Sequence, residues 1–208
     1  MEPEELGLEG PVKGSDGQRR GGADLVRIGL YFYAAMMAAA LLWRMGFYGE
    51  SILHATAGGS TADIRWGRDA LIGAVSGLAV VAISAAMTRL THWGEALARA
   101  LGSSLGELSF RDALLLACAS GLGEELFFRA ALQPRVGLLW ASLIFGAAHF
   151  VPRREMLPWS VFAVAAGLLF GVLFEWTGNV VAPIVAHALV NAVNLPLLVR
   201  DYGREPDS

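Results

Sequence analysis

The chain has one cysteine, one lysine and few charged residues for its length. Of its 208 residues only 17% are charged, against about 25% in typical soluble domains. The single cysteine, Cys118, excludes an internal disulfide and any metal site built from several thiolates. Lys13 is the one lysine among 16 basic residues, and this arginine bias indicates a GC-rich, bacterial genome. The net charge of −3 is too small to predict nucleic acid as a partner.

The first 24 residues lack the basic start and apolar core of a signal peptide. They are rich in glycine and glutamate and cannot bury enough apolar surface to order themselves. We therefore predict a disordered polar tail over 1–24, an integral membrane domain over 25–200 and a C-terminal tail over 201–208.

Apolar residues, by contrast, are abundant, at 55% of the chain, and the mean hydropathy is +0.50. A membrane-spanning helix needs about 20 mostly apolar residues. The runs that meet or approach this length are 27–47, 68–90, 111–132, 136–151, 156–175 and 180–199. They predict an all-α, polytopic membrane bundle of about six transmembrane helices; the family resemblance described below further implies that the helices surround a polar intramembrane cavity. The segment 48–67 is predicted to be a loop, and 91–110 to form a short interfacial helix.

Basic residues concentrate on the cytoplasmic side of membrane proteins. Six spans with a cytoplasmic N-terminus place 11 basic residues on the cytoplasmic side and five on the other. The distribution predicts a multi-pass protein of the cell inner membrane with both termini in the cytoplasm.

Three charged residues, Glu124, Glu125 and Arg129, lie inside the apolar run 111–132. Ionisable residues at such depth are costly and persist mainly when they pair or function. Positions four apart share a helix face, so Glu125 and Arg129 are predicted to form an ion pair. Glu124 has no such partner and is the candidate for the reacting carboxylate. The alternative is that all three charges only join helices.

Two further apolar runs each contain one histidine, His149 and His187. Phe145 precedes His149 by one helical turn, and Asn191 follows His187 by one turn. Two histidines on separate spans, together with an intramembrane glutamate, favour a shared site over two unrelated core residues. Asn191 is suited either to donate to an oxyanion or to orient His187.

Depth in the bilayer supports part of this site. Counted at 1.5 Å per residue from the nearest polar edge, Glu124 and His187 lie at about the same depth. By the same rule His149 lies only about 6 Å from Arg153 at the polar edge. This depth is too shallow for His149 to meet Glu124 and His187. A tilted, broken or displaced fourth helix, with a kink at Pro152, would remove the mismatch.

The remaining candidates receive simpler interpretations. Cys118 is conceivable as a thiol nucleophile, but a small buried hydrophobic side chain is the favoured reading. His54 and His92 fall in polar connections and are predicted to be solvated.

The motifs Glu124-Glu125 with Arg129, Phe145 with His149, and His187 with Asn191 follow one another in order. In this the chain resembles the CPBP family of intramembrane proteases, which includes CAAX prenyl endopeptidases and bacterial Abi-type proteins. The resemblance covers roughly 108–195, the motif core of the domain.

The resemblance implies an intramembrane endopeptidase whose cavity opens to the cytoplasm or to lipid. It assigns Glu124 to activating water, His149 to holding that water, and His187 and Asn191 to stabilising the oxyanion. Glu125 and Arg129 are implied to be structural or orienting residues.

The family is described both as metalloproteases and as metal-independent glutamate proteases. Glu124, His149 and His187 are therefore also possible ligands of a catalytic zinc ion. The His-Glu-x-x-His helix of soluble zinc proteases is absent from the sequence, which favours glutamate-activated water.

The implied partners are the lipid bilayer and a membrane protein or peptide substrate. The alternative function is a non-catalytic bacteriocin-immunity or peptide-binding membrane protein, which would use the same cavity. A proton or ion transporter is disfavoured because the sequence shows no inverted repeat.

Overall fold

A computed structural model describes residues 14–58, 63–106 and 108–203 of the chain. This described part is almost entirely helical and contains no strand. Its elements are α1 (Gly14–Leu41), η1 (Leu42–Phe47), α2 (Trp66–Leu90), α3 (His92–Leu105), α4 (Phe110–Glu124), η3 (Glu125–Leu132), α5 (Gln133–Ala148), η4 (Arg154–Met156), α6 (Leu157–Thr177) and α7 (Val181–Tyr202). The prediction of an all-α membrane helix bundle is confirmed.

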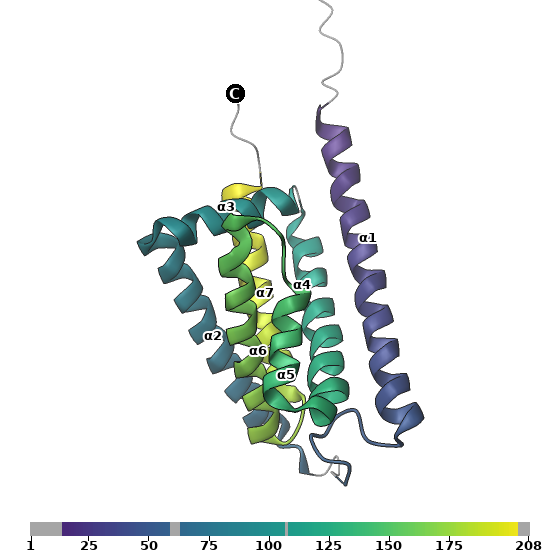
Figure 1. The fold of residues 1–208 in the computed structure, drawn as a ribbon. Helices are drawn as coiled ribbons and strands as arrows, with labels where there is room; N and C mark the ends of the chain where they lie inside the picture. Colours follow the sequence, from purple (N-terminus) through teal and green to yellow (C-terminus); the bar gives the residue numbers. More distant parts are fainter. Residues whose placement is uncertain (1–13, 59–62, 107, 204–208) are drawn as a thin grey trace, which may run out of the picture.

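Five helical stretches of the described residues are long and apolar enough to cross a membrane. The third of them, Phe110–Ala148, contains two of the six predicted spans. It is interrupted at Gly137, whose φ of 83° and ψ of 165° are not helical. The chain reverses at this point, so that α5 runs back against the direction of α4 (Figure 1). The six predicted segments are thus all present, with two of them joined in a hairpin without an intervening loop.

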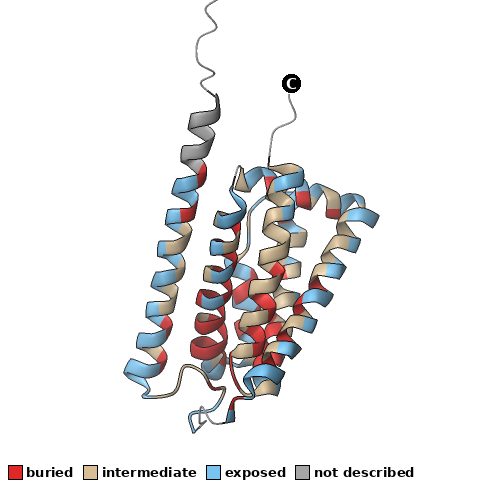
Figure 2. Ribbon diagram, turned by 180° about the vertical axis from the view of Figure 1, so that it is seen from behind, coloured by how far each residue is buried: buried red, intermediate tan, exposed pale blue. Residues whose placement is uncertain are grey.

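The described chain begins and ends at the same end of the bundle, where α3 lies across the ends of its neighbours (Figure 1). Helix α3 occupies the segment for which an interfacial helix was predicted. It starts at Thr91, whose side chain accepts a hydrogen bond from the Gly94 amide and caps the helix. Buried residues gather in the half of the bundle away from α3 (Figure 2).

Close contact between helices depends on small residues. A Cβ atom on Gly73 of α2 would lie 2.4 Å from the Ala182 carbonyl oxygen of α7, and one on Gly77 would lie 2.8 Å from the Ala186 oxygen. Helices in lipid associate largely by such close packing, because the hydrophobic effect does not drive them together. These glycines let α2 approach α7, the helix that carries His187.

A network of polar residues closes the end of the bundle opposite α3. We call Arg44, Glu50, His54, Asp69 and Asn179 the distal cluster. The Arg44 guanidinium donates to the carbonyl oxygens of Ala130 and His54 and pairs with Glu50 at 3.0 Å. The Asn179 amide donates to Asp69 at 2.8 Å, across 110 positions of sequence.

His54 belongs to this network, and the prediction that it is solvated is wrong. Its Nδ1 atom shares a hydrogen bond of 2.8 Å with the Ser51 hydroxyl. Its backbone forms an isolated β-bridge with Asn179, and the residue is only 3% exposed. Backbone hydrogen bonds join Leu53 to Val180 and Ala55 to Gly178, so this segment lies against the start of α7 and the imidazole is buried.

The predicted disordered tail over 1–24 overlaps the start of helix α1. Helix α1 begins at Gly14, and residues 1–13 lie outside the described part of the chain. The helix reaches past the apolar run that nucleates it, because helix propagation into adjacent polar residues costs little once a helix has formed. At the other end α7 continues to Tyr202, into the predicted tail 201–208, of which 204–208 are not described.

Candidate active site

The two adjacent glutamates lie where the α-helical geometry of α4 changes. Glu124 is the last residue of α4, and Glu125 begins the π-helical segment η3. Both side chains are buried, Glu124 at 6% exposure and Glu125 at 0%. A π-helical turn inside an α-helix is rare and frequently lies at a functional site. Here it separates the directions in which two neighbouring carboxylates point.

Glu125 binds two cationic or potentially cationic partners. One of its carboxylate oxygens accepts from Arg129 Nε at 3.1 Å, and the other contacts His187 Nδ1 at 2.7 Å. The predicted ion pair is present, and both of its members are completely buried. Arg129 in turn contacts Gln133, whose amide donates to the Gly171 carbonyl and to Glu175. Glu125 thus ties η3 to α7, while Arg129 ties it to α6.

Glu124 points to a different partner. Its Oε2 atom lies 3.6 Å from His149 Nε2, and this buried oxygen accepts no hydrogen bond from the described residues. The separation is too long for a direct hydrogen bond. The carboxylate oxygen and the imidazole nitrogen therefore face each other without a direct hydrogen bond, and a shared water molecule would lie beside them on the cavity side.

Hydrogen bonds define the orientation of both histidine rings. His149 Nδ1 lies 2.8 Å from the Phe145 carbonyl oxygen, which can only accept, so Nδ1 carries the hydrogen. His187 Nδ1 is held in the same way by the Glu125 carboxylate. In the neutral rings, Nε2 is then an acceptor in each case. The predicted one-turn pairing of Phe145 with His149 is thus a backbone contact that selects the tautomer.

Asn191 does not orient His187. Its Nδ2 atom donates to the Ser120 hydroxyl at 2.8 Å, and Ser120 donates in turn to the Ala117 carbonyl. The His187 Nδ1 atom is already bound by Glu125, and the Asn191 side chain points instead toward Ser120 of α4. Of the two roles considered for Asn191, orientation of His187 is wrong, and a second amide hydrogen remains free to donate.

Aromatic rings enclose the histidines. Phe170 stacks on His187 with ring centroids 5.1 Å apart, and Phe145 lies 4.5 Å from the His149 ring. Trp159 meets His149 edge-on at 5.7 Å. The Arg129 guanidinium lies over Phe145 at 5.1 Å, a cation–π contact. The rings exclude solvent and lower the local dielectric constant, which strengthens the polar contacts within.

The depth mismatch of His149 is resolved by the shortness of α5. After the break at Gly137 only 11 residues remain before α5 ends at Ala148, enough for about 16 Å of helix. Residues 149–153 then leave the helix and run toward α3, where η4 packs. An extended residue covers about 3.3 Å, so this stretch spans the distance that a helix of equal length would not. The predicted broken helix is present, with its break before Pro152, at His149.

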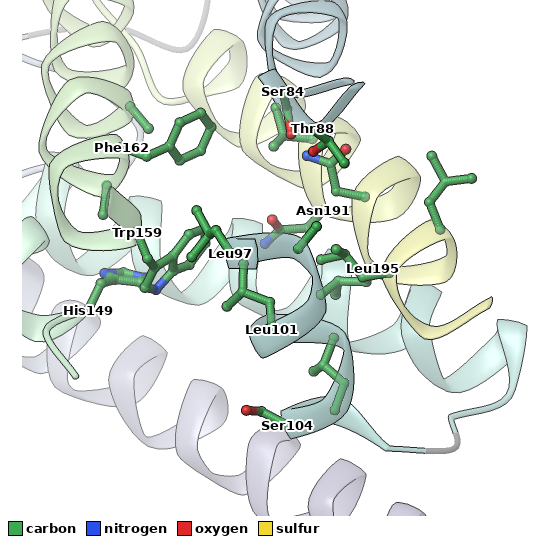
Figure 3. Close-up of a pocket in the computed structure, with 18 of the residues that line it drawn as sticks. Ser84, Thr88, Leu97, Leu101, Ser104, His149, Trp159, Phe162, Asn191 and Leu195 are labelled. Atoms are coloured by element: carbon green, nitrogen blue, oxygen red, sulfur yellow. The ribbon is translucent and has the colours of Figure 1, made fainter. Parts of the chain in front are cut away.

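These residues line one cavity of about 560 Å³. Glu124, His149, His187 and Asn191 contribute to its wall, together with residues of α1, α2, α3 and α6. Most of the wall is apolar, and Leu97 and Leu101 of α3 lie with Trp159 and Phe162 of α6 in this lining (Figure 3). We call Glu124, Glu125, Arg129, His149 and His187 the cavity cluster. An apolar cavity with a few polar groups at one place is the usual form of a ligand site.

The segment that carries the cavity cluster was compared with known proteins. Residues 106–193 match the family model described as type II CAAX prenyl endopeptidase Rce1-like. This segment is Rce1-like. The resemblance predicted from the three motifs is thereby confirmed for this part of the chain, and the family supports a CAAX-type intramembrane protease kind of function.

A relative of Bacillus subtilis (strain 168), the uncharacterized protein YpbD, is 40% identical over 82 residues. The match covers 38% of this chain and 42% of the relative, so the chain spans less than half the length of this curated protein. No solved structure matches the chain significantly. Helices α1–α3 all precede the Rce1-like segment, yet each contributes to the cavity wall.

A zinc ion does not fit the geometry of the Rce1-like segment. Among the residues that the structure describes, no three His, Cys, Asp or Glu side chains are grouped so that they could hold a metal ion. Glu124, His149 and His187 all line the cavity, but they do not form such a group. The chemistry considered below therefore uses no metal.

Three polar residues of the site were missed from the sequence. Ser120 holds Asn191, and Gln133 contacts Arg129. The Tyr33 side chain of α1 interacts with the Glu124 carboxylate, and both line the cavity. Ser120 lies one helical turn before Glu124 and Gln133 lies one turn after Arg129, so spacing alone could have indicated both. Nothing in the sequence links Tyr33 to a residue 91 positions away.

Cys118 is exposed, and the prediction of a buried hydrophobic side chain is wrong. It lies on the part of α4 that faces away from the cavity and does not contribute to the cavity wall. A thiol is apolar enough for a lipid-facing position, which is why hydropathy could not distinguish the two environments.

Proposed function

We propose that the protein is an intramembrane endopeptidase that hydrolyses peptide bonds by glutamate-activated water. The observation that carries the proposal is the pair of Glu124 and His149. A buried carboxylate oxygen without a hydrogen bond faces an imidazole nitrogen 3.6 Å away, and both line a largely apolar cavity. In the proposed arrangement a water molecule lies on the cavity side of this pair and donates one hydrogen to each of the two acceptors.

In the first step Glu124 acts as the general base. It removes a proton from the water while His149 Nε2 accepts the other hydrogen and holds the oxygen in place. The water oxygen attacks the carbonyl carbon of the substrate and forms a tetrahedral intermediate. The Phe145 carbonyl fixes the His149 tautomer that this step needs.

We assign Asn191 and His187 to stabilisation of the oxyanion. Asn191 uses one amide hydrogen for Ser120, and the second can donate toward the cavity. Because Nδ1 of His187 is bound by Glu125, the Nε2 atom is the ring nitrogen left to contact the oxyanion. It donates a hydrogen bond there only when the imidazole is protonated on both nitrogens. When the C–N bond breaks, the protonated Glu124 gives its proton to the leaving amine. The products are a carboxylic acid and an amine, and Glu124 returns to its starting state.

Glu125 and Arg129 act indirectly in this scheme. Glu125 holds His187 at 2.7 Å, and Arg129 neutralises Glu125 in a fully buried pair. We assign both residues to orientation of the site rather than to proton transfer.

The proposed substrate is a membrane protein or membrane-associated peptide. The cavity wall is mostly apolar and draws on α1, α2, α3 and α6, so it suits a chain that partitions into lipid. We place the protein in the inner membrane with both termini in the cytoplasm, because the excess of basic residues lies on that side. Cleavage would then occur toward the cytoplasmic half of the bilayer.

The experiment is a comparison of protein termini in cells that carry wild type or Glu124→Gln at matched abundance. Glutamine keeps the shape of the side chain but cannot accept the proton, so turnover should fall by roughly 10³-fold or more. Glu155→Gln is the control, because Glu155 lies exposed in η4 and does not line the cavity. Termini that disappear in Glu124→Gln and persist in Glu155→Gln name the substrates for direct cleavage by the purified protein.

The result also tests the alternative of a peptide-binding or immunity protein. A binding role needs the cavity but not the base, so Glu124→Gln would then retain protection or binding. Unchanged termini, with function intact in Glu124→Gln, would overturn the proposed chemistry.

A further inference from the structure

Helix α1 lies outside the Rce1-like segment but faces it with a regular stripe of residues. Val26, Gly29, Tyr33, Met37 and Ala40 recur at intervals of three or four, and all are buried or half-buried. The residues between them, such as Tyr31 at 76% exposure, face outward. This periodicity places one tyrosine of α1 against the bundle and the other away from it.

The approach of α1 is closest at the position before the reacting glutamate. A Cβ atom on Gly123 would lie 3.0 Å from the Tyr33 carbonyl oxygen and 3.1 Å from the Tyr33 Cβ. Only a residue without a side chain lets the backbone of α1 come so near to α4 without displacement. The close approach brings the Tyr33 side chain to the cavity wall, beside Glu124.

We infer that Tyr33 is a positioning residue of the active site, whose hydroxyl donates to the Glu124 carboxylate and aims it at His149. The inference rests on the proposed function. The Tyr33 side chain interacts with the Glu124 carboxylate, and both side chains line the same cavity beside the close approach at Gly123.

The need for such a donor follows from the side-chain freedom of glutamate. A buried glutamate loses rotamer entropy when it is fixed, and Glu124 has no ion pair such as the one that holds Glu125. A hydroxyl bound to one carboxylate oxygen keeps the other oxygen directed at the water beside Glu124 and His149. Helix α1 is therefore a part of the catalytic unit, although the family segment does not contain it.

The test compares Tyr33→Phe with Tyr31→Phe in the full-length purified protein. Each change removes one hydroxyl from α1, but only Tyr33 reaches the cavity. The substrate is the peptide identified from the Glu124→Gln comparison of termini. Tyr33→Phe should lower kcat roughly 10- to 100-fold and leave KM and the melting temperature near wild type, because a hydrogen bond to a charged group is lost without loss of packing. Tyr31→Phe should change none of these.

A double-mutant comparison shows whether the effect passes through the carboxylate. In Glu124→Asp the shorter side chain withdraws from the hydroxyl, so Tyr33→Phe should cost less than about twofold in that background. An equal loss in both backgrounds would overturn the positioning role, as would a normal kcat in Tyr33→Phe.

A second readout does not depend on proteolysis. A hydrophobic carbodiimide labels carboxyl groups within membrane proteins, and mass spectrometry locates the adduct. We expect Glu124 to be labelled several-fold faster in Tyr33→Phe than in wild type or Tyr31→Phe, because the carboxyl is released from its donor. Equal labelling in all three proteins would refute the contact between Tyr33 and Glu124. Faster labelling in a protein that cleaves nothing would instead support the contact and reject the protease.

Discussion

The distal cluster and the cavity cluster are both groups of charged residues buried in an apolar bundle, but they are completed differently. In the distal cluster, Arg44 has an ion pair and two carbonyl acceptors, and Asp69 accepts from Arg68 and Asn179. The buried Arg44 Nε forms no hydrogen bond, but it lies beside the Glu50 carboxylate and away from the cavity. In the cavity cluster, Glu125 is equally well satisfied, whereas Glu124 has an oxygen without a hydrogen bond that faces a cavity. Burial of charge is common to both. A buried polar atom that lacks a hydrogen bond and also faces a cavity distinguishes a candidate active site from a purely structural cluster.

Arg129→Ala should have the largest effect, because it breaks the pair that supports His187. It leaves the fully buried Glu125 without its guanidinium, at a cost of roughly 3–5 kcal/mol in the free energy of unfolding. Both abundance and turnover should fall. The measurement is the melting temperature in detergent together with turnover per molecule.

The matched control is Arg99→Ala, which removes an exposed arginine from an i, i+4 pair with Glu95 on α3. Exposed pairs contribute about 0–1 kcal/mol, so this variant should remain close to wild type. Equal stability of Arg129→Ala and Arg99→Ala would contradict the assignment of Arg129 as a buried counter-ion.

Arg44→Ala should separate stability from chemistry. It deprives the Ala130 and His54 carbonyls of their donor and should lower stability by an amount similar to that of Arg129→Ala. Turnover per folded molecule should remain within a few-fold of wild type, because the distal cluster does not line the cavity. Arg65→Ala, at an exposed neighbouring site, provides the comparison. A large loss of kcat in well-folded Arg44→Ala would show that the two clusters are coupled through η3.

Glu50→Gln should have the smallest effect on stability, and the size of that effect should depend on pH. The hydrogen bond from Arg135 holds the pKa of the Glu50 carboxyl below its usual 4.5, and Arg44 adds to this. A carboxyl whose pKa is lower in the folded state contributes stability above its unfolded pKa, and the contribution is lost as the pH falls through the folded pKa. Glu50→Gln should therefore lower the melting temperature at pH 7, and the difference from wild type should shrink below about pH 4. A difference that does not vary with pH would show that Glu50 acts by packing instead.

Much of the fold could be predicted from the sequence because the relevant signals are local. Apolar runs of sufficient length indicated the spans, and three motifs with a four-residue spacing indicated the ion pair and the two histidines. The shortened fourth helix was also indicated, because His149 lies so close to Arg153 in sequence. All of these follow from the pitch of a helix and the thickness of a bilayer.

The parts that were missed depend on contacts between distant segments. Asp69 meets Asn179 across 110 positions, and Tyr33 meets Glu124 through a close approach at Gly123 that no periodicity reveals. His54 was assigned to solvent because its neighbours in sequence are polar, whereas its neighbours in space are the distal cluster. The π-helical turn at Glu125 has no sequence signature either, although the helical positions of the two glutamates already predicted that only Glu125 pairs with Arg129.

The brevity of α5 has a consequence for the lipid around the protein. Its outward face, with Leu139, Trp140 and Ile144 exposed, offers about 16 Å of apolar helix to a hydrocarbon core of about 30 Å. Lipids that contact this face must compress to match it, which draws hydrated headgroups toward His149. We therefore expect turnover in reconstituted bilayers to fall as the acyl chains are lengthened, and a rate independent of chain length would refute this coupling. If turnover does fall with longer acyl chains, the thickness of the surrounding bilayer helps to set the rate of the reaction.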